Sequence, residues 1–171
     1  MAVQWFIDES KQNGLTMVVV SVDATHIGSV RARISTLPRR RGSALHFTKE
    51  SNATRASALR EIASLPLSAF IIQVPKAVRP ILARERAIRK IASEAKIMRP
   101  TRIVFERDAA VELNDRRWLR DELIRTNIEY LHLGKNGDPL LWIADAIAWA
   151  DNRGGDWLKM IAQLITKRMT A

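Results

Sequence analysis

Cysteine is absent from the 171 residues of this sequence. Its absence excludes a disulfide framework and a thiolate zinc site, two common ways of stabilising a small domain. The chain also has no uninterrupted apolar run approaching the roughly 18 residues that a membrane helix needs. The short apolar stretch at the N-terminus ends at Asp8 and Glu9, unlike a secretory signal peptide. We therefore expect a cytoplasmic protein with no membrane segment.

Several catalytic signatures are missing as well. No glycine-rich loop follows the first apolar segment, which argues against a Rossmann or P-loop nucleotide site. The sequence has no serine nucleophile elbow and no kinase-like motif. The three histidines, His26, His46 and His132, are too scattered to show metal-ligand spacing. Carboxylates are therefore the main candidates for chemistry.

Positive charge, by contrast, is plentiful. The chain has 28 Lys and Arg against 18 Asp and Glu, a formal net charge of +10. This excess favours a polyanionic partner such as nucleic acid, although a basic surface can also serve only to keep a protein in solution. The residues predicted to contact a nucleic-acid backbone are Arg39, Arg40, Arg41, Arg84, Arg89 and Lys90.

The spacing of apolar residues, which make up 47% of the chain, predicts alternating strands and helices. Strands are predicted over residues 3–8, 15–22, 44–47, 69–74, 103–106 and 128–133. Helices are predicted over residues 25–37, 51–65, 78–98, 113–124, 139–150 and 157–169. Turn residues at 11–14 join the first two strands into an antiparallel hairpin.

This order predicts an α/β fold class, in which antiparallel first strands and later βα units form one mixed sheet flanked by helices. It is the order of the ribonuclease-H-like fold, and flavodoxin-like proteins also alternate in this way. We expect one domain over residues 1–171, with 156–170 as a C-terminal helical appendage. The apolar C-terminal segments would either cover a homodimer interface or complete the core.

Acidic residues stand where two of the predicted strands end. Asp8 ends the first strand on the face shared with Phe6, and Glu9 points to the other face. Glu106 and Asp108 close a later strand, with one arginine between them. Hard divalent cations prefer such oxygen ligands, brought together from different elements. The alternative is that these acids stabilise turns or form surface ion pairs.

Two further acids belong to predicted helices. Asp145 lies inside an almost wholly apolar helical segment, where an unpaired carboxylate costs several kcal/mol and so needs a partner or a metal. A core aspartate satisfied by hydrogen bonds or by an arginine is the alternative. Glu50 stands at the start of a helix, where it would bind a metal or cap the helix.

Short motifs around these acids resemble the family called domain of unknown function 3800. They are Phe-Ile-Asp-Glu-Ser at 6–10, Leu-His-Phe at 45–47, Val-Phe-Glu at 104–106 and Ile-Ala-Asp-Ala-Ile-Ala at 143–148. They occur in the family's order over most of the chain. The family looks like a divergent branch of the ribonuclease-H-like superfamily, whose members hold two Mg²⁺ or Mn²⁺ ions with carboxylates.

The resemblance implies roles for individual residues. The implied metal-binding and catalytic residues are Asp8, Glu50, Glu106 and Asp145, with Asp108 as the alternative to Glu106. The residues expected beside them are Glu9, Ser10, His46 and Lys49. Three positions depart from the family pattern: Lys11 replaces a glycine, Trp142 a glutamine, and Glu106 the commoner aspartate.

Two functions follow as hypotheses. The first is a metal-dependent nuclease in which two Mg²⁺ or Mn²⁺ ions held by these acids cleave RNA or DNA. The second is a non-catalytic nucleic-acid-binding or regulatory module with the same fold. The sequence leaves open whether the substrate is RNA or DNA and whether cleavage is internal or from an end.

Overall fold

A single mixed sheet organises the protein. The computed structural model describes residues 1–39 and 43–171, and within them six strands pair in the order β5-β4-β1-β2-β3-β6. The strands are β1 (Val3–Ser10), β2 (Leu15–Asp23), β3 (Leu67–Val74), β4 (Arg102–Glu106), β5 (Glu129–Leu133) and β6 (Ile165–Thr170). The β1–β2 and β2–β3 pairs are antiparallel, whereas β1–β4, β4–β5 and β3–β6 are parallel. The expected fold class is confirmed.

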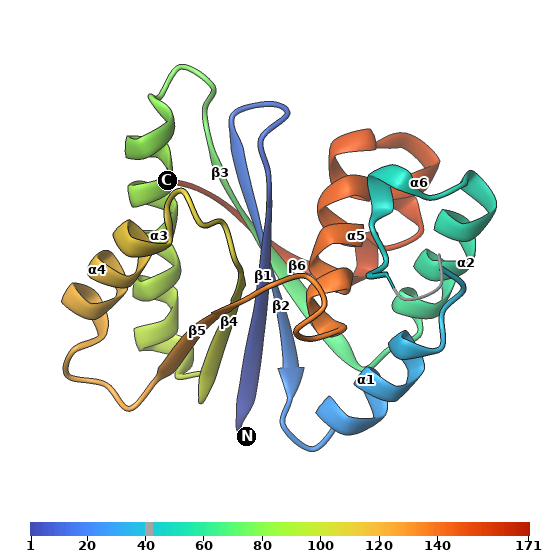
Figure 1. Cartoon of the computed structure of the whole chain (residues 1–171), viewed down its shortest axis with the longest axis horizontal. Helices are drawn as coiled ribbons and strands as arrows, with labels where there is room; N and C mark the ends of the chain where they lie inside the picture. Colours follow the sequence, from blue (N-terminus) through green and yellow to red (C-terminus); the bar gives the residue numbers. More distant parts are fainter. Residues whose placement is uncertain (40–42) are drawn as a thin grey trace.

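Helices cover both faces of this sheet (Figure 1). The α-helices are α1 (Ile27–Ser35), α2 (Asn52–Ala63), α3 (Pro80–Met98), α4 (Glu112–Leu123), α5 (Leu140–Arg153) and α6 (Gly155–Lys159). Two 3₁₀ turns, η1 (Phe47–Lys49) and η2 (Ala162–Leu164), complete the described elements. Helices α3 and α4 lie on one side of the sheet and α1, α2, α5 and α6 on the other. No helix within residues 1–39 and 43–171 is long and apolar enough to cross a membrane.

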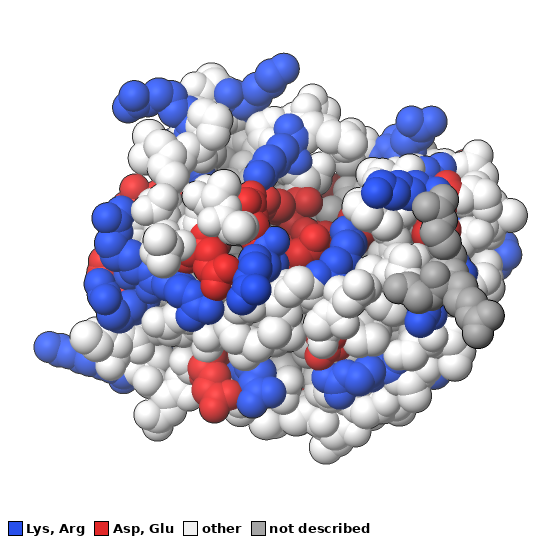
Figure 2. Space-filling model, viewed as in Figure 1, with Lys and Arg blue, Asp and Glu red and all other residues white. Residues whose placement is uncertain are grey.

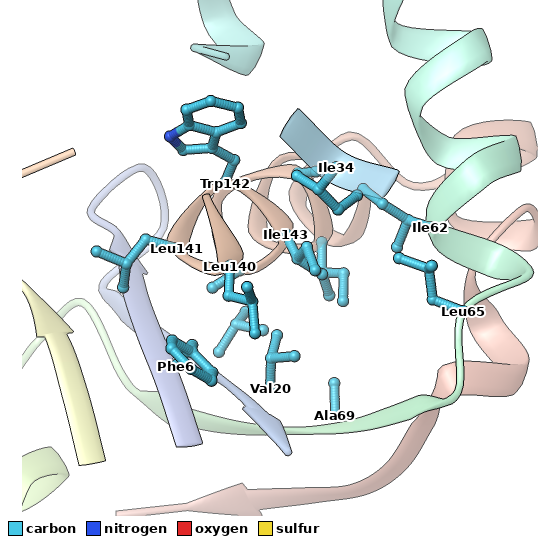
Figure 3. Close-up of a cluster of buried hydrophobic side chains, with 14 of the residues drawn as sticks. Phe6, Val20, Ile34, Ile62, Leu65, Ala69, Leu140, Leu141, Trp142 and Ile143 are labelled. Atoms are coloured by element: carbon cyan, nitrogen blue, oxygen red, sulfur yellow. The ribbon is translucent and has the colours of Figure 1, made fainter. Parts of the chain in front are cut away.

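Alternation along the strands divides the core into two layers. Phe6 on β1 packs into the cluster under α5, together with Val20 and Ala69 of the neighbouring strands (Figure 3). Trp5 and Ile7, one residue to either side of Phe6, pack into the opposite cluster under α3 and α4. Asp8 therefore shares the α5 side of the sheet with Phe6, and Glu9 lies on the α3 side, as expected from the sequence.

The segment 44–47 is not the strand that its apolar residues predicted. Residues 44–46 have no regular structure, and Phe47 begins the turn η1. The backbone N–H of Phe47 donates to the Asp145 carboxylate at 3.0 Å, so it is not available to a neighbouring strand. The Phe47 ring is fully buried and lies 5.3 Å, centroid to centroid, from that of Trp149. Tertiary packing has thus replaced strand pairing.

The predicted C-terminal helix over 157–169 is also wrong for most of its length. Helix α6 ends at Lys159, and β6 pairs in parallel with β3, which would otherwise be the edge of the sheet. The spacing of Trp157, Ile161 and Leu164 is helical, and all three pack against the core. The β-branched residues that follow favour pairing with the edge strand over a continued helix. Residues 156–170 are therefore not a helical appendage, because they contribute a strand to the central sheet.

Candidate active site

A pocket of about 510 Å³ opens where β1 and β4 end side by side. The last registered pair of these parallel strands is Ile7 with Phe105, so Asp8 and Glu106 follow it as neighbours on the α5 side. Helix α5 packs against β1 and adds Asp145, Trp149 and other residues to the pocket wall. Figure 2 shows acidic side chains gathered in a hollow at the centre of this view, with Lys and Arg around them.

The ammonium group of Lys135 is ion-paired with Asp145 and Glu106 and lies within the electrostatic influence of Asp8. Its Nζ lies 3.3 Å from Oδ2 of Asp145 and 3.6 Å from Oε1 of Glu106. Burial alone would lower the pKa of Lys135, but the charges of Asp145, Asp8 and Glu106 outweigh it and raise the pKa above its ordinary value. Lys135 is therefore held as a cation among three carboxylates, a role that sequence patterns did not reveal.

Asp145, which lies in an otherwise apolar helix and was therefore expected to need a partner, has several. It accepts a hydrogen bond from the backbone N–H of Phe47 and forms the ion pair with Lys135, while Nδ1 of His46 lies 3.9 Å away. Only 13% of its side chain is exposed. The turn η1 and the loop containing Lys135, far apart in sequence, are thus joined at one carboxylate.

The surroundings of Asp8 disfavour its ionised form. Its pKa is raised well above its ordinary value, first by burial and then by the negative charges of Asp145 and Glu106. Lys135 and the backbone N–H of Glu9, which donates to Asp8 Oδ1 at 2.7 Å, oppose this shift without cancelling it. An additional cation near Asp8 would relieve the repulsion.

The chemistry of this donor set suits a divalent cation, although its present arrangement is not that of a metal site. Oε2 of Glu106 is buried, and no described residue hydrogen-bonds to it, as expected for an oxygen that takes a partner from outside the chain. Carboxylate oxygens are the ligands that Mg²⁺ and Mn²⁺ prefer. However, within residues 1–39 and 43–171 no three Asp, Glu or His side chains are placed closely enough to hold a metal ion.

A second charged group occupies the α3 side of the same pocket. Lys11 bridges Asp108 at 2.9 Å and Glu9 at 3.1 Å. Glu9 also pairs with the guanidinium of Arg84. Asp108 therefore belongs with Glu9 and Lys11, whereas Glu106 belongs with Asp8 and Asp145, so the structure favours Glu106 over Asp108 as a partner of those two acids.

Behind this group lies a buried polar network that sequence analysis missed. Arg84 forms two hydrogen bonds of 2.8 Å with the fully buried Asp115, which also lies 3.2 Å from Nε2 of His132. For Asp115, burial would raise the pKa, but hydrogen bonds from Arg84 and His132 lower it. The only sequence signal was an aspartate on the apolar side of α4, three residues before the buried Trp118. The network fixes Arg84, and through it the carboxylate of Glu9.

The remaining expected site residues are divided between two pockets. Ser10 and His46 line the main pocket. Glu50 and Lys49 line a separate pocket together with His46 and Lys135. Glu50 follows η1, and it is Ser51 that caps α2 by accepting the backbone N–H of Thr54. The structure thus brings together three of the four proposed metal ligands and leaves Glu50 outside them.

The predicted nucleic-acid contacts are mostly engaged within the protein. Arg84 is buried and paired, Arg89 pairs with Glu85 and Glu122, and Lys90 pairs with Glu94. Arg39 donates to backbone carbonyls of residues 35, 37 and 43 and lies 4.7 Å from the ring centroid of Trp142. Arg40 and Arg41 lie outside the described residues. Arg84 in particular has no free guanidinium for phosphate.

Comparison with known proteins places the fold but not the activity. No protein-family model matches the chain, and no curated protein matches it. The structure is similar to a ribonuclease HII from Archaeoglobus fulgidus, solved in a complex with PCNA. The similarity has a TM-score of 0.59 at 15% sequence identity and covers 95% of this chain and 76% of that chain. The chain therefore has a ribonuclease-H-like fold.

Proposed function

We propose that the protein is a divalent-metal-dependent nuclease that hydrolyses phosphodiester bonds of RNA or DNA. The observation that carries the proposal is the convergence of Asp8, Glu106 and Asp145 from β1, β4 and α5 on one pocket of a ribonuclease-H-like fold. The similarity to a ribonuclease HII supports the same direction. We also propose membership of the domain of unknown function 3800 family, on the motifs that contain these acids.

Asp8, Glu106 and Asp145 would hold Mg²⁺ or Mn²⁺. The metal would supply Lewis-acid stabilisation of the phosphate and a more acidic bound water. The chain's own contribution is to hold three carboxylates in a partly enclosed pocket, with Asp145 fixed by Phe47 and Asp8 by the backbone N–H of Glu9. Glu9 and Asp108, already paired with Lys11 and Arg84, would shape the rim without binding the ion.

The nuclease proposal is tested by carboxamide substitutions that keep side-chain shape. We expect Asp145→Asn and Asp8→Asn each to lower Mn²⁺-dependent cleavage of single- and double-stranded RNA and DNA by at least about 100-fold, since even indirect support of a metal is worth 10–100-fold. Asp156→Asn is the matched control, because the Asp156 side chain is 99% exposed and away from the pocket. Cleavage that persists in both site variants would refute the proposal.

A non-catalytic nucleic-acid-binding module is the second candidate. The observation that favours it is the ion pairing already present, in which Lys135 supplies a cation to Glu106 and Asp145. This candidate predicts nucleic-acid binding that is unchanged by EDTA, together with no cleavage under any metal condition.

A further inference from the structure

Hydrogen bonds hold the backbone around Lys135 in place. It lies in the loop between β5 and α5, which a hydrogen bond of 2.7 Å from Gly137 N–H to the carbonyl of Gly134 closes into a turn. The indole N–H of the buried Trp142 donates to the carbonyl of Lys135 at 2.8 Å. Only 18% of the Lys135 side chain is exposed. Its position among the acids is therefore determined by the fold and is not that of a mobile surface lysine.

Charge balance limits how many further cations this site can accept. Asp8, Glu106 and Asp145 carry three negative charges when ionised, and Lys135 offsets one of them. The other acids of the pocket, Glu9 and Asp108, are paired with Lys11 and Arg84. Before any nucleic acid binds, the remaining charge of minus two matches a single divalent ion. Two divalent ions beside the ammonium group would instead leave an excess of two positive charges in a partly enclosed pocket, where like charges repel more strongly than in water.

We infer that Lys135 stands in for one of the two metal ions, so that the chain binds one divalent ion and uses the ammonium group as its second cation. This inference rests on the proposed function. The ammonium would remain against Glu106 and Asp145, and Asp8 and the unpartnered Oε2 of Glu106 would be the oxygens left to hold the metal. Lys135 is then one of the charged groups of the ion site, and the hydrogen bond from Trp142 holds its backbone.

The inference is tested by counting bound ions. Isothermal titration with Mn²⁺ and electron paramagnetic resonance of free Mn²⁺ would be performed on the unmodified chain, on Lys135→Gln and on Lys135→Arg. We expect one ion per unmodified chain, two per Lys135→Gln chain, and one per Lys135→Arg chain because the positive charge is retained. Lys159→Gln is the control, since Lys159 is exposed and pairs with Asp156 at the surface.

Each alternative outcome has a distinct meaning. Two ions in the unmodified chain, or a single ion in Lys135→Gln, would overturn the role of Lys135 and leave the nuclease proposal standing. No bound ion in the unmodified chain would overturn the metal site itself and this inference with it. If Lys135→Gln does not fold, a count of two ions in Lys135→Arg would still overturn the inference.

Discussion

At the scale of single residues, the ionised side chain of Asp8 should lower the stability of the folded protein when no metal is bound. Because its pKa is raised above the ordinary value of 3.8, its contribution to stability is present below pH 3.8 and is lost as pH rises through the folded-state pKa. Asn mimics the uncharged acid and can still accept the Glu9 N–H. We therefore expect Asp8→Asn to unfold at higher denaturant concentration than the unmodified chain at pH 7 in EDTA.

This difference should shrink as the pH is lowered and should be smallest below pH 3.8, where the unmodified carboxyl is protonated in both the folded and the unfolded state. Urea denaturation followed by circular dichroism at several pH values would measure it. Asp156→Asn, at an exposed position, should show no such trend. Equal or lower stability of Asp8→Asn at pH 7 would contradict the account in which burial, together with the charges of Asp145 and Glu106, disfavours ionised Asp8.

Residue patterns predicted the acids of the site better than their partners. Strand alternation placed Asp8 on the face of β1 that carries Phe6, which the structure packs under α5. The apolar context of Asp145 indicated that it needed a partner. Lys135 could not be predicted, because its loop has no periodicity and its role arises from contacts with β4 and α5. Arg84 was predicted to contact a nucleic-acid backbone, and only the tertiary structure shows that it is buried and paired with Asp115.

At the scale of elements, the hairpin turn between β1 and β2 depends on Gly14. Its φ of 80° is in the left-handed region, and a Cβ there would lie 2.3 Å from the backbone oxygen of Val74. We expect Gly14→Ala to lower the free energy of unfolding by about 1–3 kcal/mol. Thermal melting would measure the loss.

Gly28 supplies the matched comparison for that substitution. It lies in helix α1, and a Cβ added there would have no neighbour within 4 Å, so Gly28→Ala should be neutral or stabilise the protein by up to about 1 kcal/mol. Similar effects of the two substitutions would show that backbone conformation and close approach at Gly14 do not control the turn.

Element prediction succeeded where apolar periodicity was sustained and failed where tertiary contacts chose the conformation. The long apolar repeat of α3 and the β-branched run of β2 gave the correct element types. The short segment 44–47 has too few residues to specify a strand, and the Asp145 carboxylate accepts the hydrogen bond from the backbone N–H of Phe47. The residues just before 165 have helical spacing. Residues 165–170 nevertheless form a strand, because they pair with β3, which would otherwise be an open edge of the sheet.

At the scale of the whole molecule, the charge of +10 predicts salt-sensitive binding of nucleic acid. Fluorescence anisotropy with labelled RNA and DNA oligonucleotides should show affinity falling at least about tenfold between roughly 50 and 200 mM salt. Asp145→Asn should bind as tightly as the unmodified chain, because it removes negative charge from the pocket. Affinity independent of salt would contradict an electrostatic interface.

The central claim, that the acids of the pocket form an ion site, is tested most directly by thermal melting with and without Mn²⁺. For the unmodified chain, Mn²⁺ at about 100 times its dissociation constant should stabilise the fold by roughly 2.7 kcal/mol, a rise of about 5–10 °C in Tm. Asp145→Asn should lose most of this rise while Asp156→Asn keeps it. An unchanged Tm in the unmodified chain, or an equal rise in Asp145→Asn, would contradict the claim.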